Sequence, residues 1–322
     1  MERDHSICIL ISTYDGYKAL AEYTAGQIDC RWRNHPPIFF CGISREESTN
    51  KSQLTLRRDS ADWIGIARDA IQELLDCGFR MTYLVLDDHP PMGACQEKVL
   101  NFLLPQALTS LGATTISLFG TGQGRGIEGE HVVHQNLLLE HLISSHQWRY
   151  SLHPGLWSLK ALYNVLVELD TILSELTERS PWAFERVGGT DTALEKSEEA
   201  ANCYRIYSSG IVQPYKDYMV AGVLRTIGKL SRGFAGRVGG HKWWHKSSRR
   251  FDFVNHYYAG PYPVFWRGIM EKNVLNQEFI KFCRWTGKRD MSAEVLRITK
   301  PIIQRHADSR ALIVSQPIRM DH

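Results

Sequence analysis

The feature that most constrains the fold is a dense apolar run, Tyr83 to Leu86, that ends in two adjacent aspartates, Asp87 and Asp88. A run this apolar is typical of a strand that is buried on both faces of a sheet. Two carboxylates at the end of such a strand need compensation, because moving charge out of water is costly. A divalent cation supplies that compensation in one interpretation. In the other, the pair belongs to an ordinary acidic turn after a core strand.

Strand-like and helix-like segments alternate through the first third of the chain. The predicted strands cover 6–12, 36–41, 80–86 and 114–119. The predicted helices cover 17–28, 62–77 and 96–110. This order favours parallel strands joined by crossovers, and ligands bind beyond the carboxyl ends of such strands. Thr13 to Asp15 and Asp87-Asp88 both follow predicted strands, so we expect them to face one crevice.

The alternation of strands and helices changes near residue 150, which we interpret as the start of a second half within one domain. We expect a short β-like stretch at 148–152, and further on a strand at 204–212. Helices are predicted at 159–176, 190–202 and 220–230. Residues 231–250 are rich in Gly, Arg, Lys and His and predict a loop, and the chain from His306 onward predicts a loose tail.

Composition limits the partners and the cellular compartment that we expect for this chain. The chain has 322 residues with a net charge of +3, so no general binding to polyanions such as nucleic acid is expected. The 7 cysteines include no CxxC pair, which favours reduced thiols in the cytoplasm. The N-terminus lacks a signal-peptide core, and no apolar run approaches the ~20 residues of a membrane span. We therefore expect a cytoplasmic protein whose only membrane contact is peripheral, at the inner face.

Three stretches together resemble a bacterial GT-A-type glycosyltransferase of the family-2-like kind used in surface polysaccharide assembly. They are ILISTYDGY (Ile9 to Tyr17), YLVLDDH (Tyr83 to His89), and YSLHPGLWSLKAL (Tyr150 to Leu162) followed by SPWAFE (Ser180 to Glu185). The resemblance runs from about Ile7 to Gly189, and its third stretch is the most specific. It implies an inverting transferase that moves a sugar from a nucleotide-sugar, with UDP expected, to a glycan or lipid-linked acceptor.

The acid pair matches the family's metal motif in position, although this chain has DDH where DxD is usual. The implied role of Asp87 and Asp88 is to bind Mn²⁺ or Mg²⁺ at the donor's diphosphate, because hard cations take oxygen ligands. His89 is a further candidate ligand or a turn residue before two prolines.

The resemblance places nucleotide contacts after the first strand and at the start of the helix that precedes the third strand. Thr13, Tyr14 and Asp15 would contact the base or ribose, and Asp62 and Trp63 would border the nucleotide. The alternatives are a turn aspartate at Asp15, and a helix cap and core residue at Asp62 and Trp63.

The acceptor side is expected around SPWAFE. Glu185 is the candidate general base, because an inverting transferase needs a carboxylate to take the acceptor hydroxyl's proton. Trp157 and Trp182 are candidates for stacking on sugar faces, with a core position as the alternative. His153, beside Pro154-Gly155, is a candidate contact to donor or acceptor.

A basic run with interleaved aromatic residues, from His241 to Arg250, has several interpretations. It would close over the donor diphosphate, with His241 completing the metal shell, or dock on anionic lipid headgroups. Nucleic-acid binding is disfavoured because the rest of the chain is not basic, and a plain basic loop is the simplest alternative.

A glycine-rich run, Gly120 to Gly129, supports a different class of function. Residues 124–129 match G-x-G-x-x-G formally, and a helix over His131 to Ile143 would follow. The alternative is thus an NAD(P)-dependent Rossmann oxidoreductase. Against it, the residues about 20 positions on include no acidic side chain for the ribose.

The predicted architecture is α/β: a GT-A-like, Rossmann-like, mostly parallel sheet flanked by helices. Residues 1–230 would form the catalytic domain, with a nucleotide-sugar half (1–150) and an acceptor half (151–230). Residues 231–322 would add the basic loop and a C-terminal extension. A non-catalytic nucleotide- or glycan-binding protein with the same fold is the remaining alternative, because fold does not fix function.

Overall fold

The computed structural model describes residues 6–43, 54, 61–118, 130–143, 149–173, 178–190, 194, 196–208, 257–258, 260–271 and 273–315. The predictions for 220–230, for 231–250 with His241, and for the glycine-rich run fall outside these residues. The chain divides into two compact units. Unit 1 comprises residues 1–218 and 257–266, and unit 2 comprises 219–256 and 267–322.

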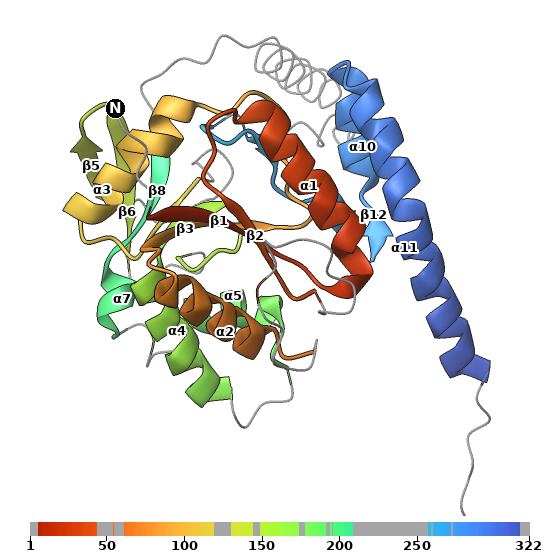
Figure 1. Cartoon of the computed structure of the whole chain (residues 1–322), viewed down its shortest axis with the longest axis horizontal. Coiled ribbons are helices and arrows are strands. Elements are labelled where there is room, and N and C mark those ends of the chain that lie inside the picture. The colour runs from red at the N-terminus through yellow and green to blue at the C-terminus, as the bar shows by residue number, and fades with distance from the viewer. Residues whose placement is uncertain are drawn as a thin grey trace, which may run out of the picture. The chain divides into compact units, whose positions relative to one another are not determined.

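Unit 1 is built around an 8-stranded sheet in the order β2-β1-β3-β7-β4-β8-β6-β5 (Figure 1). Its strands are β1 (Ile7–Ser12), β2 (Ile38–Cys41), β3 (Met81–Leu86), β4 (Thr115–Ser117), β5 (His131–His134), β6 (Leu137–Leu142), β7 (Gly155–Ser158) and β8 (Cys203–Ser208). β1 pairs in parallel with both β2 and β3, as the alternation predicts. β7 runs antiparallel between β3 and β4, so the sheet is mixed. The predicted α/β fold with a central sheet flanked by helices is confirmed at this level.

Helices cover both faces of this sheet. They are η1 (Asp15–Tyr17), α1 (Lys18–Arg31), α2 (Trp63–Asp76), the π-helical turn η3 (Val99–Leu103), α3 (Leu104–Ser110), α4 (Leu159–Ile172), α5 (Pro181–Thr190) and α7 (Glu198–Ala201). Alternate side chains of β1 point to opposite faces. Ile9 therefore packs in one core cluster with residues of α1 and α3, whereas Leu10 packs in a second cluster with residues of α2 and α4.

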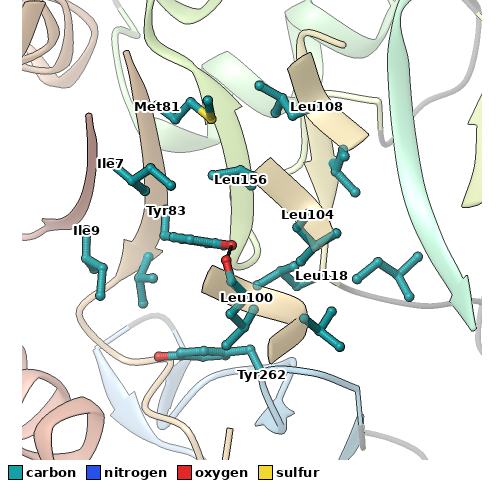
Figure 2. Packing of buried hydrophobic residues seen from close by; sticks show 14 of the residues in the cluster. Ile7, Ile9, Met81, Tyr83, Leu100, Leu104, Leu108, Leu118, Leu156 and Tyr262 are labelled. Atoms are coloured by element: carbon teal, nitrogen blue, oxygen red, sulfur yellow. Dashed lines mark hydrogen bonds between the residues drawn. The ribbon is translucent and has the colours of Figure 1, made fainter. Parts of the chain in front are cut away.

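The first of these clusters contains a buried polar contact. Tyr83 of β3 extends from the sheet toward η3, and its hydroxyl donates a hydrogen bond to the Leu100 carbonyl (Figure 2). The ring of Trp32 packs edge-on against the Tyr83 ring, with the ring centroids 5.1 Å apart. This aromatic contact ties the end of α1 to the strand that precedes the acid pair.

Three sequence predictions in unit 1 are wrong. Residues 131–142 form the antiparallel hairpin β5–β6 and not a helix, because Gln135 adopts a positive φ of 51° in a two-residue turn. Residues 149–152 are not a strand, and the strand begins at Gly155. The helix predicted over 190–202 is interrupted at 196–197 and ends in the short helix α7, Glu198–Ala201.

Two short strands complete unit 1: β9 (Tyr257–Tyr258) pairs antiparallel with β10 (Val264–Phe265). Unit 2 contains β11 (Met270–Glu271), β12 (Val274–Leu275), α10 (Gln277–Trp285) and α11 (Arg289–Ser315). The tail predicted from His306 is wrong, because α11 continues through that residue. In the described part of the chain, no helix combines the length and apolar character needed to cross a membrane.

Candidate functional site

The carboxyl ends of β1 and β3 bring together two residues that are far apart in the sequence. The Thr13 hydroxyl donates a hydrogen bond of 2.6 Å to Oδ2 of Asp87. The Asp87 N–H donates to the Ser12 carbonyl at 3.1 Å, which continues the pairing of the two strands. The hydroxyl of Thr24, on α1, donates to the Asp87 carbonyl. The two strand ends therefore lie side by side, and the expected ligand crevice between them stays a prediction.

A glycine after β2 allows this close arrangement. Gly42 has a φ of 91°, and a Cβ atom there would lie 1.9 Å from the Thr13 carbonyl oxygen. The Thr13 N–H donates to the Cys41 carbonyl at 3.1 Å. Only glycine fits a backbone position with both this φ and this contact.

Tyr14 and Asp15 follow Thr13 at the same end of β1. The Tyr14 side chain is 36% exposed, and its ring centroid lies 4.6 Å from that of Tyr17. Asp15 is half-buried and begins η1. The structure thus places both residues beside the Thr13–Asp87 pair, where the sequence predicts a nucleotide contact.

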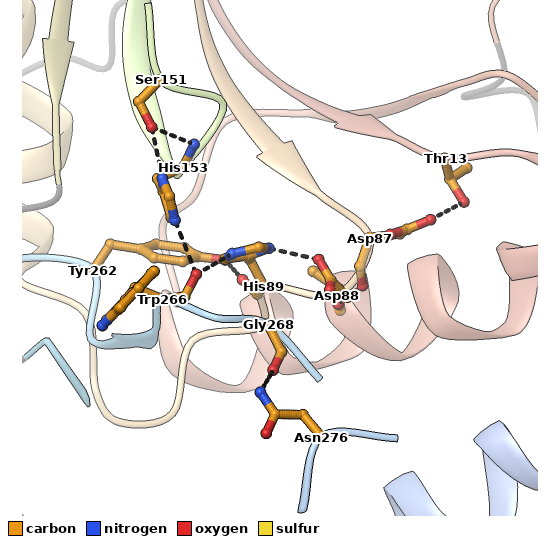
Figure 3. A network of polar contacts seen from close by, with 11 residues as sticks. Thr13, Asp87, Asp88, His89, Ser151, His153, Tyr262, Trp266, Gly268 and Asn276 are labelled. Atoms are coloured by element: carbon orange, nitrogen blue, oxygen red, sulfur yellow. Dashed lines mark hydrogen bonds and ion pairs between the residues drawn. The ribbon is translucent and has the colours of Figure 1, made fainter. Parts of the chain in front are cut away.

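The second acid of the pair is held by a histidine. Oδ1 of Asp88 lies 2.6 Å from Nδ1 of His89, and Nε2 of His89 donates to the Trp266 carbonyl at 2.9 Å (Figure 3). His89 is only 5% exposed, and its own carbonyl accepts a hydrogen bond of 3.0 Å from the Tyr262 hydroxyl. Two residues distant in sequence therefore fix the conformation of the turn after Asp88.

The acid pair is electrostatically strained. Burial, followed by the charge of Asp88, raises the pKa of the Asp87 carboxyl to about 8. Burial lowers the pKa of His89, but the carboxylate and hydrogen bond of Asp88 outweigh it, so the net shift is upward. Two neighbouring carboxylates cannot both ionise easily in a partly buried site, and a bound cation relieves that cost.

A second histidine meets the same carbonyl. Nε2 of His153 donates to the Trp266 carbonyl at 2.9 Å, so that oxygen accepts from His89 and His153 together (Figure 3). Because a carbonyl only accepts, both imidazoles carry a proton on Nε2. Burial, followed by the charge of His89, lowers the pKa of His153 to about 3, which keeps this ring neutral.

Ser151 connects His153 to the predicted base, Glu185. The Ser151 hydroxyl lies 2.6 Å from Nδ1 of His153 and 3.3 Å from Oε1 of Glu185. The Leu152 N–H donates to the same Oε1 at 2.7 Å. Burial raises the pKa of the Glu185 carboxyl, although the hydrogen bonds from Leu152 and Ser151 oppose that rise. The other oxygen, Oε2, accepts no hydrogen bond from a described residue.

The local sequence explains how Glu185 is presented. Pro181 stands at the start of α5, where a missing N–H costs nothing. The Ser180 hydroxyl accepts a hydrogen bond from the Ala183 N–H at 3.2 Å, which caps the helix. Phe184, the residue before Glu185, is fully buried and anchors this turn of α5 in the core. A capped, anchored helix thus holds the carboxylate against the 151–153 segment.

Residues 261–266 form a strap that is bound to the loop after β3. The Met92 N–H donates to the Pro263 carbonyl at 2.7 Å, and the Gln96 N–H donates to the Pro261 carbonyl at 2.9 Å. Sequence reasoning did not identify this strap or the role of Ser151. The key group of the strap is the Trp266 carbonyl. Every residue type carries a peptide carbonyl, so no residue pattern in the sequence indicates its role.

Asp62 and Trp63 have structural partners. Asp62 caps α2 by accepting from the Gly65 N–H at 3.0 Å, and it also pairs with Nε of Arg179 at 2.7 Å. Trp63 is 8% exposed and donates from Nε1 to the Ser12 hydroxyl at 2.8 Å. These contacts match the cap and core alternatives, and a contact of either residue with a nucleotide stays a prediction.

The two candidate stacking tryptophans occupy different environments. Trp157, on β7, is fully buried, with its ring centroid 6.2 Å from that of Phe184. Trp182, in the first turn of α5, is 67% exposed. Of the two, only the Trp182 ring has a face open to a ligand.

The residues present fit a metal ion in part. Within the described ranges, no group of three or more His, Cys, Asp or Glu side chains is arranged to hold one. Asp87 and Asp88 do form a pair of hard oxygen donors, and a cation would offset the repulsion between their negative charges. Magnesium sites are commonly built from one or two carboxylates plus substrate phosphates, which is the number of carboxylates found here. His241, the predicted third ligand, lies outside the described residues.

Two comparisons with known proteins give no family for the chain. A scan against protein-family models finds no match for the chain, and a search of curated proteins finds none with significant similarity.

Proposed function

We propose that this chain is a metal-dependent glycosyltransferase with a GT-A-type fold. It would move a sugar from a nucleotide-sugar, with UDP as the expected nucleotide, to a glycan or a lipid-linked acceptor. The observation that carries the proposal is the arrangement of carboxylates in unit 1. The acid pair at the end of β3 and the carboxylate on α5 are linked by a series of polar contacts: Asp88, His89, the Trp266 carbonyl, His153, Ser151 and Glu185. The Ser151 hydroxyl proton is shared between two acceptors, Nδ1 of His153 at 2.6 Å and Oε1 of Glu185 at 3.3 Å.

The donor side is assigned to the carboxyl ends of β1 and β3. Asp87 and Asp88 would hold Mn²⁺ or Mg²⁺, which offsets the negative charge on the leaving diphosphate. Thr13 orients the Asp87 carboxylate through its 2.6 Å hydrogen bond. Tyr14 and Asp15, at the same strand end, would contact the base or ribose of the nucleotide.

The acceptor side is assigned to α5 and the segment before β7. Glu185 is held through Oε1, so Oε2 is left to take a proton from an acceptor hydroxyl. The acceptor oxygen would bond to the anomeric carbon as the bond from that carbon to the diphosphate breaks. This in-line displacement inverts the anomeric configuration. The raised pKa of Glu185 makes its ionised form a stronger base.

The sheet topology supports the same proposal. The antiparallel strand β7 lies between β3 and β4, and it places residues 151–158 beside the strand that carries the acid pair. A purely parallel sheet built from the order of the first segments would not bring the acceptor-side residues to β3. The mixed sheet therefore joins the two predicted halves of the site.

The dinucleotide-binding alternative loses its main structural support. A Rossmann fingerprint requires a helix directly after the glycine-rich loop, because the helix N-terminus binds the pyrophosphate. In this chain the residues after the glycine-rich run form the β5–β6 hairpin. No observation among the described residues favours a second function over the transferase.

Calorimetric titration with UDP, in Mn²⁺ or in EDTA, tests the donor side of the proposal. Asp88→Ala is the test variant. Asp76→Ala, at the exposed end of α2, is the matched control. We expect UDP binding that requires Mn²⁺, disappears in Asp88→Ala and persists in Asp76→Ala. Binding in EDTA would refute the metal role of the acid pair. Absence of binding to UDP, GDP, dTDP and CMP would refute the transferase.

Glu185→Gln separates an enzyme from a non-catalytic binding protein. Glutamine keeps an oxygen for the Leu152 N–H but cannot take a proton. Once a donor sugar is identified from the titrations, the variant should bind that donor as the wild type does and transfer the sugar at least about 100-fold more slowly. Equal transfer rates would remove Glu185 from the role of base.

A further inference from the structure

Positive charge is concentrated in the C-terminal third of the chain. Residues 1–210 contain 18 Lys and Arg against 27 Asp and Glu, whereas residues 211–322 contain 20 against 8. Residues 1–210 therefore carry a net negative charge and residues 211–322 a net positive charge, although the whole chain carries +3. Charge asymmetry of this size is typical of proteins that meet an anionic surface.

The helix α10 carries part of this charge on one exposed stripe. Lys281, Arg284 and Trp285 are exposed, and Lys288 follows just beyond the helix end. The spacing of three and four residues places Lys281, Arg284 and Trp285 on a single face of α10. The opposite face of α10 is buried through Phe279, Ile280, Phe282 and Cys283. The helix is thus amphipathic, with cations and one tryptophan on its outer side.

The helix α11 repeats this pattern within unit 2. Its buried stripe contains Met291, Val295, Ile298 and Ile302. Its exposed residues include the cations Arg289, Arg297, Lys300 and Arg305. Glu294 pairs with Arg297 at 2.6 Å, so one of these charges is already neutralised within the helix.

Large apolar side chains accompany the cations. In unit 2, Val274 is 60% exposed, Trp285 is 53% exposed and Leu296 is 41% exposed. Trp285 stands between Arg284 and the Lys288-Arg289 pair in the sequence. An exposed tryptophan with cations beside it in the sequence, on an amphipathic helix, is typical of helices that lie in a membrane interface.

We propose that the outer faces of α10 and α11 form a docking surface for an anionic lipid bilayer. Lys281, Arg284 and Lys288 would meet the headgroups, and Trp285 would insert at the boundary between headgroups and acyl chains. This surface is distinct from residues 241–250, for which the sequence predicted a peripheral contact. The proposal does not depend on the transferase activity, which is assigned to unit 1.

A lipid surface fits these residues better than a nucleic acid does. Basic side chains serve either partner, and an exposed tryptophan can stack on a base. Exposed Leu296 and Val274, however, gain nothing from a phosphate backbone, whereas the apolar boundary of a bilayer removes them from water. Nucleic-acid binding is therefore the competing outcome of the test.

Vesicle co-sedimentation of the full chain tests the proposal. The probes are vesicles of phosphatidylcholine alone and of phosphatidylcholine with one third phosphatidylglycerol. We expect binding to the anionic vesicles only, with an affinity that falls as salt is raised. Lys281→Glu/Arg284→Glu should weaken that binding by at least about 30-fold, since each cation near an anionic membrane contributes about 1 kcal/mol. Trp285→Ala should weaken it on the order of 10-fold.

Matched controls separate docking from general charge effects. Lys98→Glu/Lys160→Glu reverses two exposed cations of unit 1, and Trp182→Ala removes a tryptophan that is more exposed than Trp285. Both controls should bind the anionic vesicles as the wild type does. Equal losses in the controls, or equal binding to neutral vesicles, would overturn the proposal. Binding to single-stranded RNA without binding to anionic vesicles would assign the surface to nucleic acid instead.

Discussion

Carboxylates at two places in unit 1, one buried on the sheet and one half-buried at the end of β3, are compensated differently. Glu140 on β6 lies directly opposite Arg205 on β8, and the guanidinium donates to both carboxylate oxygens at 2.7 and 2.8 Å. Asp87, after β3, faces the Thr13 hydroxyl and a second carboxylate, Asp88. Asp88 in turn lies against an imidazole, with its Oδ1 2.6 Å from Nδ1 of His89.

This difference separates a structural role from a functional one. A carboxylate matched by a guanidinium has its charge balanced within the protein, so it gains little from a bound cation. At the acid pair, burial and the charge of Asp88 disfavour the ionised form of Asp87, and a bound cation would favour it. The acid pair therefore has the electrostatics of a binding site, whereas Glu140 and Arg205 do not.

The largest expected effect comes from breaking the matched pair. Arg205→Met leaves Glu140 buried and unpaired, so it should reduce the free energy of unfolding by about 3–5 kcal/mol. The double variant Glu140→Leu/Arg205→Met should recover most of that loss, because it removes both buried charges. Urea unfolding of the three variants against the wild type measures both values. A loss in the double variant as large as in Arg205→Met would show that the lost stability comes from packing and not from the unpaired charge.

Removing a charge from the acid pair should stabilise the folded chain, whereas removing Arg205 should destabilise it. The pKa of Asp87 is raised to about 8 in the folded chain, above its unfolded value. The stabilisation that its proton provides is complete below the unfolded pKa and is lost as the pH rises through about 8. Asp87→Asn is neutral at every pH, so in EDTA at pH 9 it should be more stable than the wild type. The expected gain is at least about 1.4 kcal/mol, the free energy of one pKa unit.

Thermal unfolding of both proteins at pH 5 and pH 9 checks this prediction. The difference between them should grow with pH and shrink when Mn²⁺ is added to the wild type. A variant that is less stable than the wild type at pH 9 would mean that the acid pair is fully compensated in the folded chain.

A smaller effect is expected where the carboxylate is held by neutral donors. Ser151→Ala removes the hydroxyl that contacts both His153 and Glu185, and should lower the stability by about 1 kcal/mol, the value of an ordinary hydrogen bond. Ser151→Thr keeps the hydroxyl and is the control. Urea unfolding at pH 7 measures both, and equal losses in the two variants would place the cost in packing.

The smallest effect on stability is expected at Glu185. Glu185→Gln keeps the acceptor for the Leu152 N–H, so the free energy of unfolding at pH 7 should change by less than about 1 kcal/mol. The raised pKa of Glu185 gives the change a sign: the wild type loses stability as the pH rises through that pKa, so the variant should be slightly more stable at high pH. A loss as large as that of Arg205→Met would make Glu185 a structural residue.

Local patterns were sufficient where a segment is buried by its own composition. The apolar runs that became β1 and β3 are continuous, and α2 has regular amphipathic spacing, so each was predicted close to its observed bounds. The hairpin β5–β6 was mistaken for a helix because its apolar residues fit both periods. Its turn depends on a positive φ at Gln135, a conformation that glutamine does not signal.

The position of a carboxylate pair at the end of a buried strand could be predicted from residues 83–88 alone, because apolar density and its interruption are local properties of the chain. The surroundings of that pair could not be predicted in this way, because they come from distant segments. The contacts of the Trp266 carbonyl with His89 and His153 span 177 and 113 residues. The antiparallel entry of β7 beside β3 is a choice of sheet partner that no local pattern encodes. Such contacts arise from how distant segments close on one another, and that closure depends on the packing of the whole sheet.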